Sequence, residues 1–126
     1  STKGSAEGEQ VTKMREAYKI LEERKVGFEF DGELQLDAAI VPEVADQKAK
    51  GSNVAGAANV LIFPDLCSGN IGYKLVQRFA KAKALGPLIQ GLARPVHDIS
   101  RGVDDIVDVV AITCAEAAEF CEILTL

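Results

Sequence analysis

Long apolar runs are missing from this 126-residue sequence. No stretch approaches the roughly 20 consecutive apolar residues that a membrane helix needs, and no signal peptide is visible. We therefore expect no membrane partner. Hydrophobic residues make up 48% of the chain and charged residues 26%, which is typical of a globular protein and not of a disordered one. The length suits one modest domain.

An excess of positive charge is also missing, because the formal net charge is −5. Binding to nucleic acid usually requires a basic surface, so we expect no nucleic-acid partner. A small anionic ligand stays possible, since it needs positive charge only at one place.

Cysteine and histidine are scarce, with three cysteines and one histidine. Cys114 and Cys121 are expected on one helix about 10 Å apart, which is too far for a disulfide. These cysteines and His97 do not have the spacing of a metal site, so we expect none. A reducing cytoplasmic setting fits best. His97 has no partnered Ser or Cys beside it that would make it a catalytic base.

Hydrophobic spacing predicts alternating helices and strands. The stripe of Val11, Met14, Tyr18 and Leu21 marks an amphipathic helix. The continuously apolar residues 60–63 indicate a parallel strand buried on both faces. Helices are expected over residues 9–25, 36–48 (interrupted at Pro42), 71–84 and 103–124, and strands over residues 28–30, 60–63 and 86–92. This order predicts an α/β fold with right-handed parallel crossovers.

Ligands of such sheets bind beyond the carboxyl ends of the strands. Residues 64–70 and 93–102 are the two loops expected at that edge. Asp65 directly follows a strand and is a candidate for ligand binding. Asn70 is a second candidate, although a role as helix cap explains it equally well.

The stretch Asp98–Ile106, "DISRGVDDI", places a cation before a helix start. The free N–H groups at a helix start favour anions. Ser100 adds a hydroxyl donor, and Gly102 permits close approach of the backbone. The alternative is that Arg101 pairs with Asp98 or Asp104 and only fixes the loop.

Asp104 and Asp105 fall in the first turn of the expected helix, where acidic residues complement the helix dipole. Beside Arg101, one of them could instead take a proton from a thiol or hydroxyl. The opening residues 1–5, "STKGS", could form a small nest of N–H groups for an anion.

Several blocks resemble one enzyme family: "STKGS", "DGELQLDAAIVPEVA", "GSNVAGAANVLIFPDLCSGNIGYKLVQRF", "ALGPLIQGLARPVHDISRG" and "DDIVDVVAIT". In this order they look like the C-terminal portion of phosphate acetyltransferase (phosphotransacetylase). The resemblance runs from Ser1 to about Ala117. It implies a three-layer, Rossmann-like parallel-sheet sandwich within a two-domain subunit.

The resemblance also implies a reaction in which acetyl-CoA and phosphate give acetyl phosphate and CoA, without a metal or prosthetic group. Ser100, Arg101 and Gly102 match the family's "SRG". Ser100 would hydrogen-bond the reacting group, and Arg101 would bind phosphate or the CoA side. Asp105, before "IV", would take the thiol proton. Asp104 is the alternative, because only Val103 separates the two motifs.

The implied organisation places residues 1–96 in the second α/β domain. Residues 97–126 would form the active-site loop and a helix that packs on a missing first domain. We also expect a homodimer, and little activity from the 126 residues alone. Two alternatives stay open: a non-catalytic acetyl-CoA-sensing domain like that of hybrid malic enzymes, and a phosphate butyryltransferase.

Overall fold

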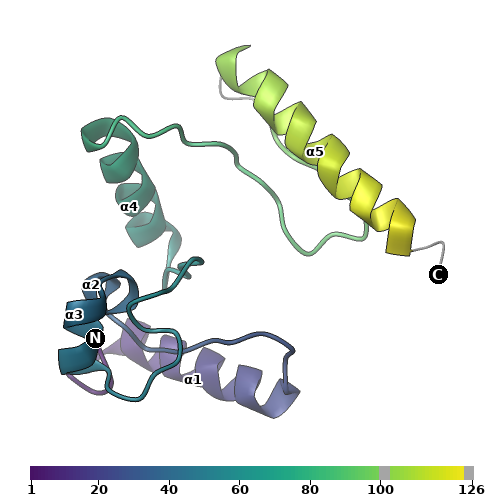
Figure 1. Ribbon diagram of the computed structural model, residues 1–126. Helices are drawn as coiled ribbons and strands as arrows, with labels where there is room; N and C mark the ends of the chain where they lie inside the picture. Colours follow the sequence, from purple (N-terminus) through teal and green to yellow (C-terminus); the bar gives the residue numbers. More distant parts are fainter. Residues whose placement is uncertain (100–102, 124–126) are drawn as a thin grey trace. The chain divides into compact units, whose positions relative to one another are not determined.

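The computed structural model describes the backbone of residues 1–99 and 103–123 and the side chains of residues 1–99 and 106–118. The chain divides into two compact units, Ser1–Gly72 and Tyr73–Leu126. The described residues form five helices (Figure 1): α1 (Glu9–Arg24), α2 (Leu36–Ile40), α3 (Pro42–Lys48), α4 (Leu66–Phe79) and α5 (Val103–Ile123). In the part of the chain that the structure describes, no helix is long and apolar enough to cross a membrane.

Helix α1 has the bounds that its apolar stripe predicts, to within one residue. It ends where Lys25 adopts a left-handed backbone, with φ 49° and ψ 51°. On the stripe, the Tyr18 ring lies 5.2 Å from the Phe30 ring, centroid to centroid. Phe30 in turn meets Phe28 edge to face at 6.3 Å. Tyr18 on the apolar side of α1 therefore packs against the segment that follows the helix.

Helices α2 and α3 confirm the predicted helix with a break at Pro42. Proline lacks an N–H donor, so it is accommodated at the first position of α3. Four small residues are buried here: Ala38, Ala39, Ala45 and Ala49. The amide of Gly56 donates to the carbonyls of Ala38 and Ala39 at 3.0 Å. Its φ of +82° and the Pro42 Cα, 2.8 Å from where a Cβ would stand, leave no room for a side chain.

The three expected strands do not form in the described residues, and this part of the prediction needs correction. Residues 60–63 are extended but unpaired, and Val60 and Ile62 are 71% and 75% exposed. The single bridge in the described part of the chain is antiparallel and joins Leu88 to His97. A strand exists only through hydrogen bonds to a neighbour. Apolar periodicity identifies a segment suited to a sheet, but it cannot supply that neighbour.

Helix α4 begins five residues before the predicted start, because the capping group is Asp65 and not Asn70. The Asp65 carboxylate accepts a hydrogen bond from the Ser68 amide at 2.7 Å, and the Ser68 hydroxyl donates to the Asp65 carbonyl at 3.0 Å. This is the arrangement of a helix N-cap. Within the first unit, the Phe63 ring lies against Gly69 and Gly72 of α4.

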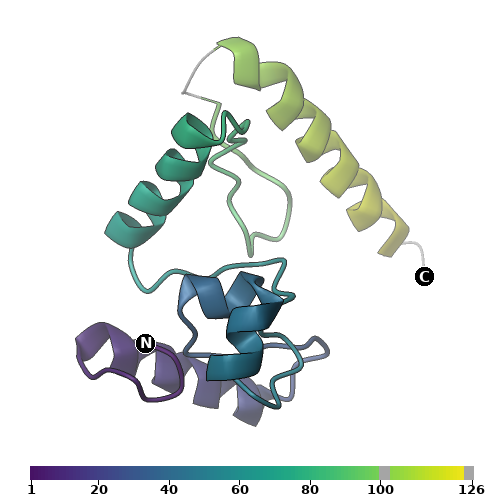
Figure 2. The same ribbon diagram turned by 60° about the vertical axis from the view of Figure 1, so that its left-hand side comes forward.

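In the second unit, residues 80–99 connect α4 to α5 without a helix (Figure 2). Lys83 forms an ion pair with Asp108 of α5. A helix as apolar as α5 needs a covering partner. Val109 is 1% exposed, but Val107 and Val110 on the same helix are exposed. Part of the apolar surface of α5 is thus uncovered in this chain.

Candidate functional site

The predicted centre of the site lies mostly outside the described residues. This applies to Ser100, Arg101 and Gly102 and to the side chains of Asp104 and Asp105. The backbone of the two aspartates lies in the first turn of α5, where the sequence placed it. Their roles therefore stay predictions.

The structure describes both Asp65 and Asn70. Asp65 caps α4, and Asn70 lies within that helix. Hydrogen bonds from the backbone and the hydroxyl of Ser68 lower the pKa of the Asp65 carboxyl. The carboxylate therefore stays charged at the positive end of α4. Asn70 lies one turn further inside the helix, so it does not cap it. The structure gives Asp65 a structural role and does not test ligand binding by either residue.

Residues 1–5, predicted as a nest of N–H groups, bind a carboxylate of the same chain through one backbone N–H group and one hydroxyl. Oε1 of Glu33 accepts hydrogen bonds from the Ser1 hydroxyl at 2.7 Å and from the Gly4 amide at 2.8 Å. Arg15 of α1 donates to both carboxylate oxygens, through Nε at 2.6 Å and Nη2 at 3.3 Å. We call these four residues the Glu33 clamp. The Glu33 carboxylate therefore binds where the sequence suggested an external anion.

Glu33 has the most strongly shifted carboxyl pKa in the described part of the chain. The hydrogen bond from Arg15 lowers this pKa to about 2, assisted by the donors Gly4 and Ser1 and opposed by burial. The Glu33 side chain is only 7% exposed. A buried carboxylate with this many donors stays ionised and holds its donors in place. Hydrophobic spacing and motifs could not predict this contact, because Arg15 and Glu33 are 18 residues apart.

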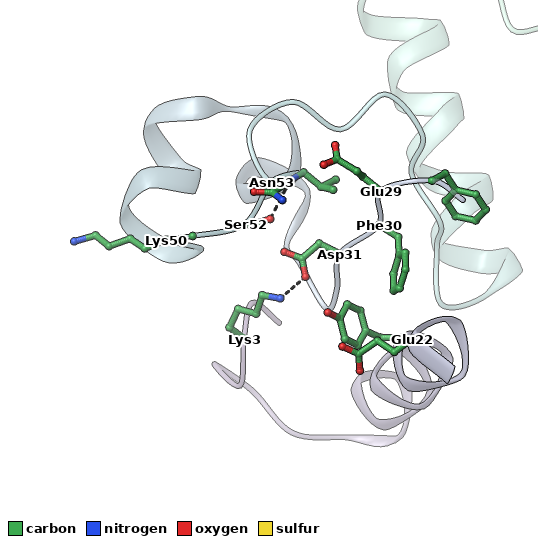
Figure 3. A pocket seen from close by; sticks show the side chains of 12 residues that line it. Lys3, Glu22, Glu29, Phe30, Asp31, Lys50, Ser52 and Asn53 are labelled. Carbon is green, nitrogen blue, oxygen red and sulfur yellow. Dashed lines mark hydrogen bonds and ion pairs between the residues drawn. The ribbon is translucent and has the colours of Figure 1, made fainter. Parts of the chain in front are cut away.

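A polar cavity of about 420 Å³ is lined by Lys3, by α1 and by residues 28–31 and 50–54 (Figure 3). Lys3 pairs with Asp31 at its edge and also lies over the Tyr18 ring, 5.5 Å from the centroid. Burial of Asp31 raises the pKa of its carboxyl, but hydrogen bonds from Lys3 and Ser52 outweigh burial and lower it. Lys50 and the acidic Glu22 and Glu29 complete a lining of mixed charge. Lys3 is therefore already neutralised by Asp31, and Lys50 is the second lysine of this lining.

A second hollow in the first unit is apolar and larger, about 820 Å³. Its lining combines the α1 stripe with residues 58–64. The side of α1 and the extended segment 60–63 therefore share one uncovered apolar surface. We call it the apolar groove.

Metal binding finds no support in the described residues, where His, Cys, Asp and Glu side chains do not gather in groups of three. Cys67 and Cys114 are exposed free thiols.

The family profile described as phosphate acetyl/butaryl transferase matches residues 1–114. This chain belongs to that family. The match includes every residue that the sequence analysis assigned to the site. It confirms the resemblance from which the roles of Ser100, Arg101 and Asp105 were inferred.

Among the relatives, the phosphate acetyltransferase of Clostridium acetobutylicum is 62% identical over 119 residues, and that of Treponema pallidum is 54% identical over 121 residues. Each match covers 93% of this chain but 36% of the relative. The chain thus spans about a third of the length of these family members.

Solved structures of the family have a similar backbone. The EutD phosphotransacetylase from Staphylococcus aureus is 48% identical, with a TM-score of 0.80 over 95% of this chain and 37% of its own. A phosphotransacetylase from Streptococcus pyogenes is 53% identical, with a TM-score of 0.87 over 94% and 37%. The path of this chain is therefore that of a phosphotransacetylase segment, although its extended segments are unpaired.

Proposed function

We propose that this chain supplies about a third of a phosphate acetyltransferase, which transfers an acetyl group between CoA and inorganic phosphate. One observation carries the proposal: relatives named phosphate acetyltransferase are 50–62% identical to nearly the whole chain. The family description also includes butaryl transfer, but the names of these relatives favour acetyl over butyryl. Identity of this extent also favours a catalytic segment over a sensing domain.

The roles of the residues follow from charge and position. Arg101 would hold the phosphate or the CoA side, with Gly102 giving access to the backbone and Ser100 donating to the reacting group. Asp105, or alternatively Asp104, would take the proton of the CoA thiol, so that the thiolate attacks acetyl phosphate directly. Asp65 and Asn70 are proposed to line the same site. No cofactor is needed, since the reaction depends on positioning and on charge stabilisation.

The complete fold that we propose is a three-layer parallel-sheet sandwich within a two-domain subunit. Residues 1–96 would belong to one domain, and residues 97–126 would pack on the other. Residues 60–63 would become a strand when a neighbour pairs with them, and the apolar groove would then be covered. The exposed apolar residues of α5 fit a homodimer contact, and the free thiols fit a reducing cytoplasm.

A hybrid enzyme tests this proposal. The chain replaces the matching 36% of the Clostridium acetobutylicum enzyme, and acetyl phosphate formation from acetyl-CoA and phosphate is measured. We expect turnover that depends on both substrates and is greater with acetyl-CoA than with butyryl-CoA. A folded hybrid without activity would contradict the proposal, provided that the parent enzyme is active in the same assay.

A further inference from the structure

The only histidine of the chain is buried in the second unit, between the loop that leads to Ser100 and helix α5. The His97 side chain is 1% exposed. Its Nδ1 accepts a hydrogen bond from the Ile89 amide at 3.1 Å. Its Nε2 lies 2.7 Å from Oε2 of Glu116 on α5. Both ring nitrogens therefore have a partner.

These partners define the state of the imidazole. Nδ1 can accept from an N–H group only when it carries no proton. The neutral ring therefore has its proton on Nε2 and donates it to the Glu116 carboxylate. The antiparallel bridge between Leu88 and His97 adds a backbone contact at the same place. One side chain thus ties both ends of the loop 89–96 to each other and to α5.

His97 stands three residues before Ser100 in the sequence. Three extended residues span at most about 10 Å, so an anchor at His97 limits where the following residues can lie. Glu116 provides that anchor from α5, the helix that begins directly after the "SRG" motif. A displacement of about 1 Å at a reacting group can cost about a hundredfold in rate.

We propose that His97, held by Glu116, is a positioning residue that sets the place of Ser100, Arg101 and Gly102 for acyl transfer. The role in acyl transfer rests on the proposed function, whereas the hydrogen bond between His97 and Glu116 of α5 does not. His97 acts through the residues that follow it and does not itself take a proton from the substrate.

The link can be tested in the 126-residue chain alone, because a single histidine gives an unambiguous nuclear magnetic resonance signal. A long-range ¹⁵N–¹H spectrum of the neutral imidazole should show a protonated Nε2 and an unprotonated Nδ1. In Glu116→Ala the Nε2 proton should exchange faster with water. A ring protonated on Nδ1, or a spectrum that Glu116→Ala leaves unchanged, would contradict the hydrogen bond between His97 and Glu116, independently of any enzyme activity.

Two substitutions of His97 separate its two hydrogen bonds in the hybrid enzyme. His97→Asn retains an acceptor near the position of Nδ1 but cannot reach Glu116. His97→Gln retains a donor near the position of Nε2 but loses the bond to Ile89. We expect His97→Asn to lower kcat about tenfold or more and to raise the KM for CoA, because misplaced reacting groups lose both rate and contacts. His97→Gln should restore most of both values.

The KM separates positioning from simple loss of folded protein, which lowers the apparent kcat but leaves the KM unchanged. Asp108→Asn is the matched control, because it removes an ion pair between Lys83 and the same helix without touching His97. It should leave both constants within about twofold, as expected for an exposed pair. If the unsubstituted hybrid is active and His97→Asn matches it in kcat and KM, the positioning role is wrong. If the folded hybrid is itself inactive, the proposed function fails instead.

Discussion

Arg15 and Glu33 form a two-point ion pair that ties α1 to the segment before α2. Nε of Arg15 lies 2.6 Å from one carboxylate oxygen, and Nη2 lies 3.3 Å from the other. The carboxylate is buried, whereas the Arg15 side chain is 40% exposed. The pair also holds the first residues of the chain, because Ser1 and Gly4 donate to the same carboxylate.

Substitution of Arg15 by Ala should therefore destabilise the chain, because it leaves a buried carboxylate without its main partner. Arg15→Lys should restore only part of the loss, since an ammonium group cannot make two parallel hydrogen bonds. Urea unfolding followed by circular dichroism measures the free energy of unfolding. Lys48→Ala removes the exposed pair with Asp37 and should cost no more than about 1 kcal/mol. Equal effects of Arg15→Ala and Lys48→Ala would show that the Glu33 clamp contributes little.

Glu33 also predicts how stability depends on pH. Its pKa is about 2 in the folded chain, against 4.5 as the ordinary value. As pH falls, the unfolded chain therefore binds the proton first, and protonation favours unfolding. The contribution of Glu33 is complete above about pH 5 and is lost as pH falls from there towards 2.

The difference in unfolding free energy between the wild type and Glu33→Gln isolates this contribution from other carboxylates, whose pKa values are lowered in the same direction. It should be greatest near pH 6 and shrink by up to about 3 kcal/mol by pH 2. A difference that stays constant over this range would contradict the assigned pKa.

How far the sequence predicted these features depends on whether they are local. The start of α1 and the break at Pro42 were predicted, because an apolar stripe and the geometry of proline act within a few residues. The start of α4 was predicted at residue 71 but lies at Leu66, because hydrophobic spacing does not show the cap formed by Asp65 and Ser68. Asp65 was predicted as a ligand-binding residue, which stays a prediction, and its role as the cap of α4 was not predicted.

Contacts between distant residues could not be predicted in this way. The sequence suggested that "STKGS" binds an external anion, but it could not show that the carboxylate of Glu33 binds there instead. The buried His97 was judged from its neighbours in the sequence, and its partner Glu116 is 19 residues away. Residues 60–63 have the composition of a buried strand, but pairing depends on a neighbour that periodicity cannot locate.

The contact between Phe63 and α4 gives a prediction with a built-in control. A Cβ at Gly72 would stand 3.0 Å from two atoms of the Phe63 ring, whereas a Cβ at Gly69 would stand 3.6 Å from its nearest neighbour. Alanine favours a helix over glycine by about 0.5–1 kcal/mol, so Gly69→Ala should be neutral or stabilising. Gly72→Ala should destabilise by about 1 kcal/mol, because the ring must move. Thermal unfolding of both variants compares them, and a Gly72→Ala variant as stable as Gly69→Ala would contradict the packing.

The proposed reaction predicts distinct effects for Arg101 and the two aspartates in the hybrid enzyme. Arg101→Ala should raise the KM for CoA or phosphate and lower turnover, because a charge-assisted contact is worth roughly 1.5–3 kcal/mol. Asp105→Asn should lower turnover while the melting temperature stays unchanged. If Asp104→Asn has that effect instead, the base is Asp104. Wild-type kinetics in all three variants would contradict the proposed roles of these residues.

The most direct test of the account compares acetyl phosphate formation by the 126-residue chain alone with that by the hybrid enzyme. The chain corresponds to 36% of its relatives, and residues 60–63 and the apolar groove are uncovered in it. We predict activity that requires both substrates in the hybrid and little or none in the chain alone. Robust activity of the isolated chain, or a folded hybrid without activity, would contradict the proposal that this chain supplies about one third of a phosphate acetyltransferase.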